Sequence, residues 1–128
     1  MEYFSLSELT HTNTGIENTP TPSVKENLER LVDCVLDPCR RMYGNPISVN
    51  SGYRSLEVNK KVGGAATSQH LKGEAADITG GSCSENKKLF EILKSRGVFD
   101  QLIDEYDYKW VHVSFKKGKN RQQVIHKR

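Results

Sequence analysis

Apolar residues recur at helical spacing between residues 24 and 43. The positions are Val24, Leu28, Leu31, Val32, Val35, Cys39 and Met42. Ser23 and Glu26 precede most of them with the spacing of a capping box, so we predict one long core helix over about residues 24–43. Pro38 lies inside that range and predicts a kink, because its ring removes one donor and crowds the carbonyl of Cys34.

Shorter patterns of the same kinds predict the other elements. Helical spacing or a capping box predicts helices at about residues 5–9, 55–62 and 82–97. Alternating apolar residues predict strands at residues 47–51, 75–78, 99–106 and 109–115. The segment 10–22 is rich in Thr, Asn, Gly and Pro and predicts a surface loop. Together these elements indicate an α+β domain, with a small antiparallel sheet and helices packed on one of its faces.

The last two predicted strands form a hairpin that turns at residues 107–108 and places Glu105 opposite Trp110. The period of two then divides the side chains between two faces. One face carries Ile103, Glu105, Trp110, His112 and Ser114, and the core face carries Val111, Val113 and Phe115. In this register Glu105 lies diagonal to His112, while Asp104 is turned away.

A length of 128 residues, with 35% hydrophobic and 27% charged residues, is typical of one soluble globular domain. The sequence contains no apolar run near the roughly 20 residues that a membrane helix needs. Its start, Met1-Glu-Tyr-Phe-Ser5, lacks the basic-then-apolar order of a signal peptide. We therefore expect a soluble monomer that is synthesised in the cytoplasm.

The basic residues are unevenly distributed. Six of the 19 lie in residues 116–128, which contain no acidic residue, and 13 remain against 16 acidic residues elsewhere. We assign residues 1–115 to the folded domain and residues 116–128 to a basic tail of that domain, predicted to be solvated and partly disordered. The tail has no interleaved aromatic residues, so we expect no specific nucleic-acid binding. The cysteines, Cys34, Cys39 and Cys83, form no Cys-x-x-Cys pair and are predicted to be buried free thiols.

The stretch from Ser68 to Asp77 carries residue types that bind metals. His70 and Asp77 lie seven residues apart with Gly73 between them, so an imidazole and a carboxylate can hold a borderline cation where a loop enters a strand. His112 interrupts an apolar strand pattern and is the candidate third ligand, although each histidine alone would also fit a structural role. Three such ligands leave a fourth position open for water, as a catalytic zinc site requires.

Three motifs follow one another along the chain. They are Ser51-Gly-Tyr-Arg54 followed by Asn59 and Gly64, then Ser68-x-His70-x-x-Gly73-x-Ala75-x-Asp77, then Trp110-x-His112-x-Ser114. In this order and spacing the chain resembles the peptidase M15 family over about residues 3–115. That family comprises zinc D-alanyl-D-alanine carboxypeptidases and phage endolysin peptidases, with a hedgehog signalling domain as a relative.

The resemblance implies a Zn²⁺ ion bound by His70, Asp77 and His112, in a groove on the sheet face opposite the helices. It also implies that the guanidinium fork of Arg54 holds a substrate carboxylate or a developing oxyanion. Contacts with the substrate are further expected from Ser68, Gln69 and Trp110.

The general base is the point at which this sequence departs from many relatives. They place the acid three residues before the last histidine, where this chain has Lys109. Glu105 fits a subgroup with a Gln-Leu-Ile-x-Glu strand, matched here by residues 101–105, and the hairpin register agrees. Asp107 is the alternative.

The activity that the resemblance implies is hydrolysis of peptidoglycan stem peptides near a D-alanine, as a carboxypeptidase or an endolysin-type endopeptidase. Zinc would activate a water molecule and Glu105 would accept its proton. A wall enzyme without a signal peptide indicates a phage or prophage lysin, with a cytosolic dipeptidase as the alternative. The rival class is a zinc-stabilised binding module without turnover, and the retention of Arg54 and Glu105 argues against it.

Overall fold

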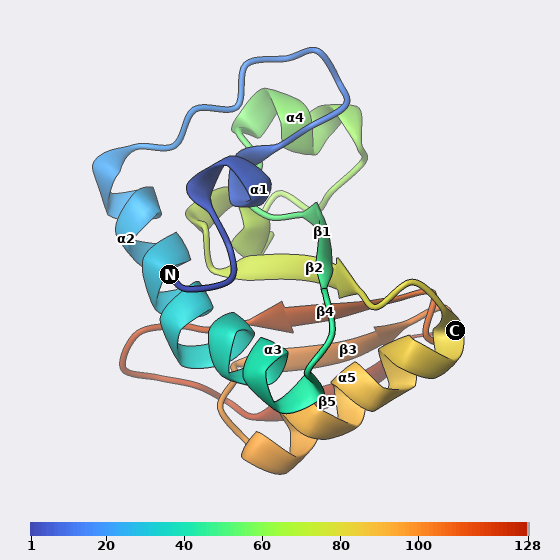
Figure 1. The fold of residues 1–128 in the computed structure, drawn as a ribbon. Helices are drawn as coiled ribbons and strands as arrows, with labels where there is room; N and C mark the ends of the chain where they lie inside the picture. The colour runs from blue at the N-terminus through green and yellow to red at the C-terminus, as the bar shows by residue number, and fades with distance from the viewer. Residues whose placement is uncertain (128) are drawn as a thin grey trace.

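The centre of the fold is a five-stranded sheet in the order β1-β2-β4-β3-β5 (Figure 1). The computed structural model describes residues 1–127. The strands are β1 (Ser48–Ser51), β2 (Ala75–Thr79), β3 (Gln101–Glu105), β4 (Trp110–Ser114) and β5 (Gln123–Lys127). The pairs β1–β2, β2–β4 and β3–β4 are antiparallel, and β3–β5 is parallel. The predicted α+β class is confirmed.

Five of the seven helical segments contribute to the core on one face of this sheet, while the two that lie between β1 and β2 in the chain contribute no residue to it (Figure 1). In chain order the seven are α1 (Leu6–Thr10), α2 (Pro22–Leu31), the π-helical η1 (Val32–Leu36), α3 (Asp37–Tyr43), α4 (Leu56–Lys61), the 3₁₀-helical η2 (Gln69–Lys72) and α5 (Cys83–Arg96). The buried core lies between α2, η1 and α5 and the sheet residues Ala76, Ile78, Leu102, Val111 and Val113. We call this side of the sheet the helix face. In residues 1–127, the helices are all too short or too polar to cross a bilayer.

The long helix predicted over residues 24–43 is the unbroken succession α2, η1 and α3. It begins earlier than predicted, because the Thr21 hydroxyl accepts the N–H of Val24 and caps the helix in place of Ser23. The feature observed before Pro38 is a π-helical segment, in which the Asp37 N–H donates to Val32 O. Proline has no N–H to give to the carbonyl four residues earlier.

That unused carbonyl belongs to Cys34, and it is not left without a partner. Arg96, in the last turn of α5, donates from Nη1 to Cys34 O at 3.0 Å. A side chain 62 residues away therefore supplies the hydrogen bond that Pro38 removes. The same contact ties α5 to the irregular part of the long helix.

The predicted register of the hairpin is confirmed, since Glu105 pairs with Trp110 and Ile103 pairs with His112. Its turn is longer than predicted, because residues 106–109 lie outside the ladder. Tyr106, Asp107 and Tyr108 have φ values of 52°, 57° and 65°, in the left-handed region. Asp104 is turned to the helix face, where its carboxylate accepts the N–H of Tyr108 at 2.6 Å.

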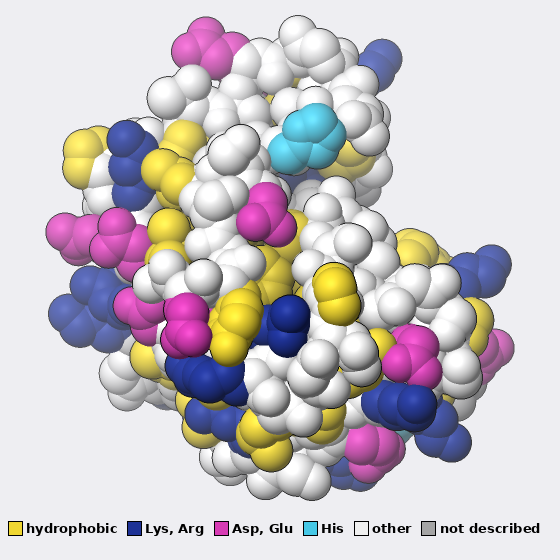
Figure 2. Space-filling model, in the orientation of Figure 1, with side chains coloured by type: hydrophobic (Ala, Val, Ile, Leu, Met, Phe, Trp, Pro, Cys, Tyr) yellow, Lys and Arg dark blue, Asp and Glu magenta, His cyan; other side chains and the backbone are white. Residues whose placement is uncertain are grey.

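The basic tail is more ordered than predicted. Residues Gln123–Lys127 form β5, which extends the sheet beyond β3. The expectation of a solvated, partly disordered tail is therefore wrong for this segment. On the face seen in Figure 2, basic and acidic side chains are interspersed.

The cysteines are all free thiols, as predicted, but they differ in exposure. Cys39 is buried, and this burial raises the pKa of its thiol to about 12. Cys34 is partly buried, whereas Cys83, in the first turn of α5, is exposed. The prediction of three buried thiols is thus wrong for Cys83, because the apolar positions that anchor α5 lie further along the helix.

Candidate metal centre

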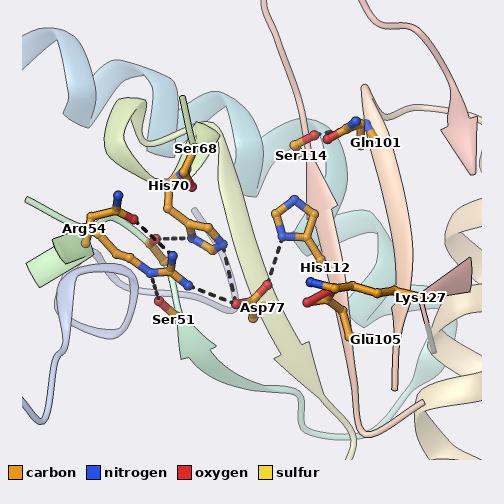
Figure 3. A network of polar contacts seen from close by, with 12 residues as sticks. Ser51, Arg54, Ser68, His70, Asp77, Gln101, Glu105, His112, Ser114 and Lys127 are labelled. Atoms are coloured by element: carbon orange, nitrogen blue, oxygen red, sulfur yellow. Dashed lines mark hydrogen bonds and ion pairs between the residues drawn. The ribbon is translucent and has the colours of Figure 1, made fainter. Parts of the chain in front are cut away.

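Three side chains converge on the sheet face opposite the helices. His70 comes from η2, Asp77 from β2 and His112 from β4 (Figure 3). Asp77 and His112 are directly paired across the β2–β4 ladder, so the antiparallel register alone places their side chains next to each other. We call the side of the sheet that carries Asp77 and His112 the metal face.

The donor atoms of these three residues lie within 4.8 Å of one another. His112 Nδ1 is 3.0 Å from Asp77 Oδ1, and His70 Nε2 is 3.5 Å from Asp77 Oδ2. Ligands that share one tetrahedral zinc ion at about 2.0–2.1 Å lie about 3.3 Å apart. The donor set and its spacing therefore fit a zinc ion.

The imidazole of His70 is held in an orientation suited to metal binding. Its Nδ1 lies 2.7 Å from Gly52 O, and a carbonyl can only accept, so Nδ1 carries a proton and Nε2, which is directed at Asp77, is the nitrogen available to a metal ion. Ser68 caps η2 by accepting the N–H of His70. The helix then ends at Gly73 with φ 71°, where any Cβ would crowd Val24.

The carboxylate of Asp77 stays charged although its side chain is only 10% exposed. Burial disfavours the charged form, but hydrogen bonds from His112 and His70 outweigh it and hold the pKa of Asp77 well below its usual range. A ligand carboxylate that is already ionised costs no proton release when a cation binds.

The guanidinium of Arg54 lies beside this carboxylate. It donates to Ser51 Oγ at 3.1 Å, to Asn59 Oδ1 at 3.3 Å and to Asp77 Oδ2 at 3.5 Å (Figure 3). A Cβ at position 64 would overlap Asn59 and approach Arg54, which explains why glycine occurs there. Arg54 is thus brought to the metal face by the same motif residues that the sequence singled out.

Two comparisons with known proteins bear on this arrangement. The profile of the peptidase M15 family matches residues 2–114. The chain belongs to the peptidase M15 family. Over 81 residues it is also 36% identical to the zinc D-Ala-D-Ala carboxypeptidase of Streptomyces albus G. That similarity covers 62% of this chain but only 32% of the Streptomyces protein, so the chain spans about a third of that relative's length.

The two candidate carboxylates of the hairpin lie in different places. Glu105, at the end of β3, lies on the metal face and diagonal to His112, as the register predicted. Its side chain is 12% exposed, and its Oε1 is 3.7 Å from Lys127 Nζ. Asp107 lies in the exposed hairpin loop. The structure therefore brings Glu105, rather than Asp107, to the sheet surface that bears the metal ligands.

The three further residues predicted to contact the substrate have different surroundings. Ser68 is the cap of η2, and Gln69 donates from Nε2 to Asp100 Oδ2 at 3.0 Å. Trp110 lies on the metal face and packs edge-on against Tyr106, with ring centroids 5.4 Å apart. Trp110 Nε1 is buried without a hydrogen-bond partner in the described structure. Contact with a substrate stays a prediction for all three.

Sequence reasoning missed the residues that brace the site. The amide of Asn18, in the loop 11–21, donates to Tyr53 O at 2.8 Å and accepts the N–H of Ser55 at 2.6 Å, so it clamps the backbone on both sides of Arg54. Asp100 is 1% exposed and accepts from Gln69, the neighbour of His70. An isolated Asn or Asp in a polar segment gives no periodic signal that would have revealed either role.

Asp100 also holds the segment that follows β4. Arg121 donates to its carboxylate from the backbone N–H, Nε and Nη2, each at 2.9 Å. These hydrogen bonds from Arg121, helped by Gln69, lower the pKa of Asp100 from its usual 3.8 to about 2.

We expect the Asp100→Asn variant to be less stable than the wild type by about 1–2 kcal/mol at neutral pH, measured by thermal melting in a chelator. Because the pKa of Asp100 is lower in the folded protein than in the unfolded chain, the stabilisation by its charge is fully present above about pH 4. That stabilisation is lost as the pH falls through about 2. The difference between the two proteins should therefore shrink below pH 4. A difference that stayed constant down to pH 2 would show that the charge of Asp100 does not stabilise the fold.

Proposed function

We propose that this chain is a zinc peptidase that hydrolyses peptidoglycan stem peptides next to a D-alanine. The observation that carries the proposal is the convergence of His70, Asp77 and His112 on one face of the sheet, with Arg54 and Glu105 on either side. Membership of the M15 family and the named activity of the Streptomyces relative support the same choice of metal and substrate.

A zinc ion held by His70 Nε2, Asp77 and His112 Nδ1 would supply Lewis acidity that activates a water molecule and polarises the scissile carbonyl. Glu105 takes the proton of the attacking water and returns it to the leaving amine. Since water itself attacks the carbonyl and Glu105 only transfers its proton, the hydrolysis needs no covalent intermediate.

Arg54 is suited to hold negative charge on the substrate. Its described contacts use three of the five N–H groups of a guanidinium, and its side chain is 16% exposed. Two N–H groups are left to bind a terminal carboxylate or the carbonyl oxygen as it gains charge. Trp110 and Tyr106 provide an apolar wall on the same face, next to Glu105.

We expect Arg54→Lys to retain the fold and the zinc but to lose about 10²–10³-fold in kcat/KM, because a single ammonium cannot keep the contacts with Ser51, Asn59 and Asp77 and also bind the substrate. Steady-state kinetics on a stem peptide measures this loss. Arg30→Lys is the matched control, since Arg30 makes its polar contacts on α2, away from the site. Wild-type kinetics in Arg54→Lys would assign Arg54 to structure.

Mass spectrometry of purified peptidoglycan treated with the zinc-loaded protein tests the proposed function. Release of terminal D-alanine would identify a carboxypeptidase, and new ends at cross-links would identify an endopeptidase of the kind that phage or prophage lysins use. Retention on the wall without any product would instead support the zinc-stabilised binding module.

A further inference from the structure

The parallel pairing of β5 with β3 brings a lysine to the candidate base. Lys127 is the ladder partner of Glu105, so the two side chains project from the same side of the sheet. Lys127 Nζ lies 3.7 Å from Glu105 Oε1 and 5.3 Å from the centre of the Tyr106 ring. Figure 3 shows the ammonium next to the Glu105 carboxylate, beside His112.

The register of β5 is fixed by contacts on the opposite face. His126 Nδ1 is 3.1 Å from Asp104 Oδ2, and the His126 ring packs against Phe90 of α5. Alternate residues of a strand point to opposite faces. Because His126 points to the helix face, Lys127 points to the metal face. The Tyr106 N–H also donates to Lys127 O at 2.7 Å, which holds the backbone of Lys127 beside Glu105.

Two residues of the segment after β4 are thus linked to the site, one indirectly and one directly. Arg121 holds Asp100, which holds Gln69 next to the ligand His70. Lys127 contacts Glu105 directly. The match to the M15 profile ends at residue 114, so Lys127 belongs to a part of this chain that the family comparison does not cover.

We propose that Lys127 is a positioning residue for the proposed hydrolysis, and that its ammonium holds the Glu105 carboxylate directed along the metal face. The Glu105 side chain is only 12% exposed, so the attraction between its carboxylate and the neighbouring ammonium is weakly screened by solvent. Lys127 itself is 54% exposed and can follow the carboxylate as its charge changes during turnover. This inference rests on the role of Glu105 in the proposed function.

The kinetics of Lys127 variants test the proposal. Lys127→Met should lower kcat about fivefold at unchanged KM, zinc content and melting temperature, which corresponds to the upper end for a partly exposed ion pair. Lys127→Arg, which restores the positive charge, should recover most of the loss. Adding Lys127→Met to Glu105→Gln should change nothing further, because a residue that acts through Glu105 has no effect once the base is removed.

Lys88→Met is the matched control, since Lys88 forms an exposed ion pair with Glu85 at 2.9 Å on α5. It should leave the kinetics unchanged. Wild-type kcat in Lys127→Met, or losses that multiply in the double variant, would overturn the proposal. A rise in KM alone would also overturn it and would assign Lys127 to substrate binding.

A structural measurement that does not depend on activity distinguishes failure of this proposal from failure of the proposed function. In crystal structures, the Glu105 carboxylate should leave its position in Lys127→Met and keep it in Lys127→Arg. If the zinc-loaded wild type cleaves no peptide but this displacement is seen, the proposed function fails and the positioning contact stands. An unmoved Glu105 in Lys127→Met contradicts the positioning role whatever the activity.

Discussion

Replacing His70 or His112 with alanine is expected to remove the bound zinc and, with it, all measurable hydrolysis. Each imidazole supplies one of three donors that lie within 4.8 Å of one another. Two remaining ligands do not hold zinc firmly, since zinc sites use three or four protein donors. Elemental analysis should find about one zinc per chain in the wild type and almost none in either variant.

The variants also need a test of folding, because His70 is 3% exposed and contacts Gly52 O. His112→Gln keeps a polar side chain at the more accessible position and should lose zinc without unfolding. Melting curves recorded in a chelator compare the metal-free proteins directly. His11→Ala is the control, since His11 is exposed and its ring forms a hydrogen bond with Asn13, away from the three candidate ligands. Full zinc occupancy in the His70→Ala, His112→Ala double variant would disprove the site.

The convergence of the three candidate ligands could be predicted, because the motifs that carry them lie where local periods decide which way side chains point. Within β2 and β4 the period of two decides which side chains leave the core, and the apolar residues Ala76, Ile78, Val111 and Val113 fix that choice by burial. Asp77 and His112 are the residues left facing outward on paired positions. Gly73 marks the turn that delivers His70 to the same place.

Strand β5 could not be predicted in the same way. Its residues, Gln-Val-Ile-His-Lys, contain two apolar positions in a basic segment, and both are only partly buried. An edge strand gains much of its order from backbone hydrogen bonds to its neighbour, which composition does not reveal. The contact between His126 and the buried Asp104 adds a long-range term that no local pattern contains.

The π-helical segment before Pro38 has the same origin. The sequence shows that Cys34 O loses its usual donor, but the replacement comes from Arg96, on another helix. The sequence likewise shows a polar loop at residues 10–22, while the function of its Asn18 depends on backbone groups around Arg54. Local chemistry identifies which groups need a partner, and only the fold determines which partner they find.

Glu105→Gln is expected to lower turnover by about 10²–10⁴-fold, the contribution of a positioned general base. The pairing of Glu105 with Trp110 and of Ile103 with His112 puts this carboxylate on the metal face. Glutamine keeps the shape of the side chain but does not accept the proton, so zinc content and melting temperature should barely change. Because kcat carries the loss, KM should stay close to the wild-type value.

Asp107→Asn is the comparison variant for Glu105→Gln, because Asp107 is the alternative candidate for the general base in the hairpin. It lies in the exposed loop with φ 57°, past the last ladder pair, where asparagine is equally able to adopt the left-handed backbone. We therefore expect nearly wild-type turnover from Asp107→Asn and a large loss from Glu105→Gln. If Asp107→Asn were inactive and Glu105→Gln active, the loop of residues 106–109 would have to refold over the metal face when substrate binds, and Asp107 would be the base.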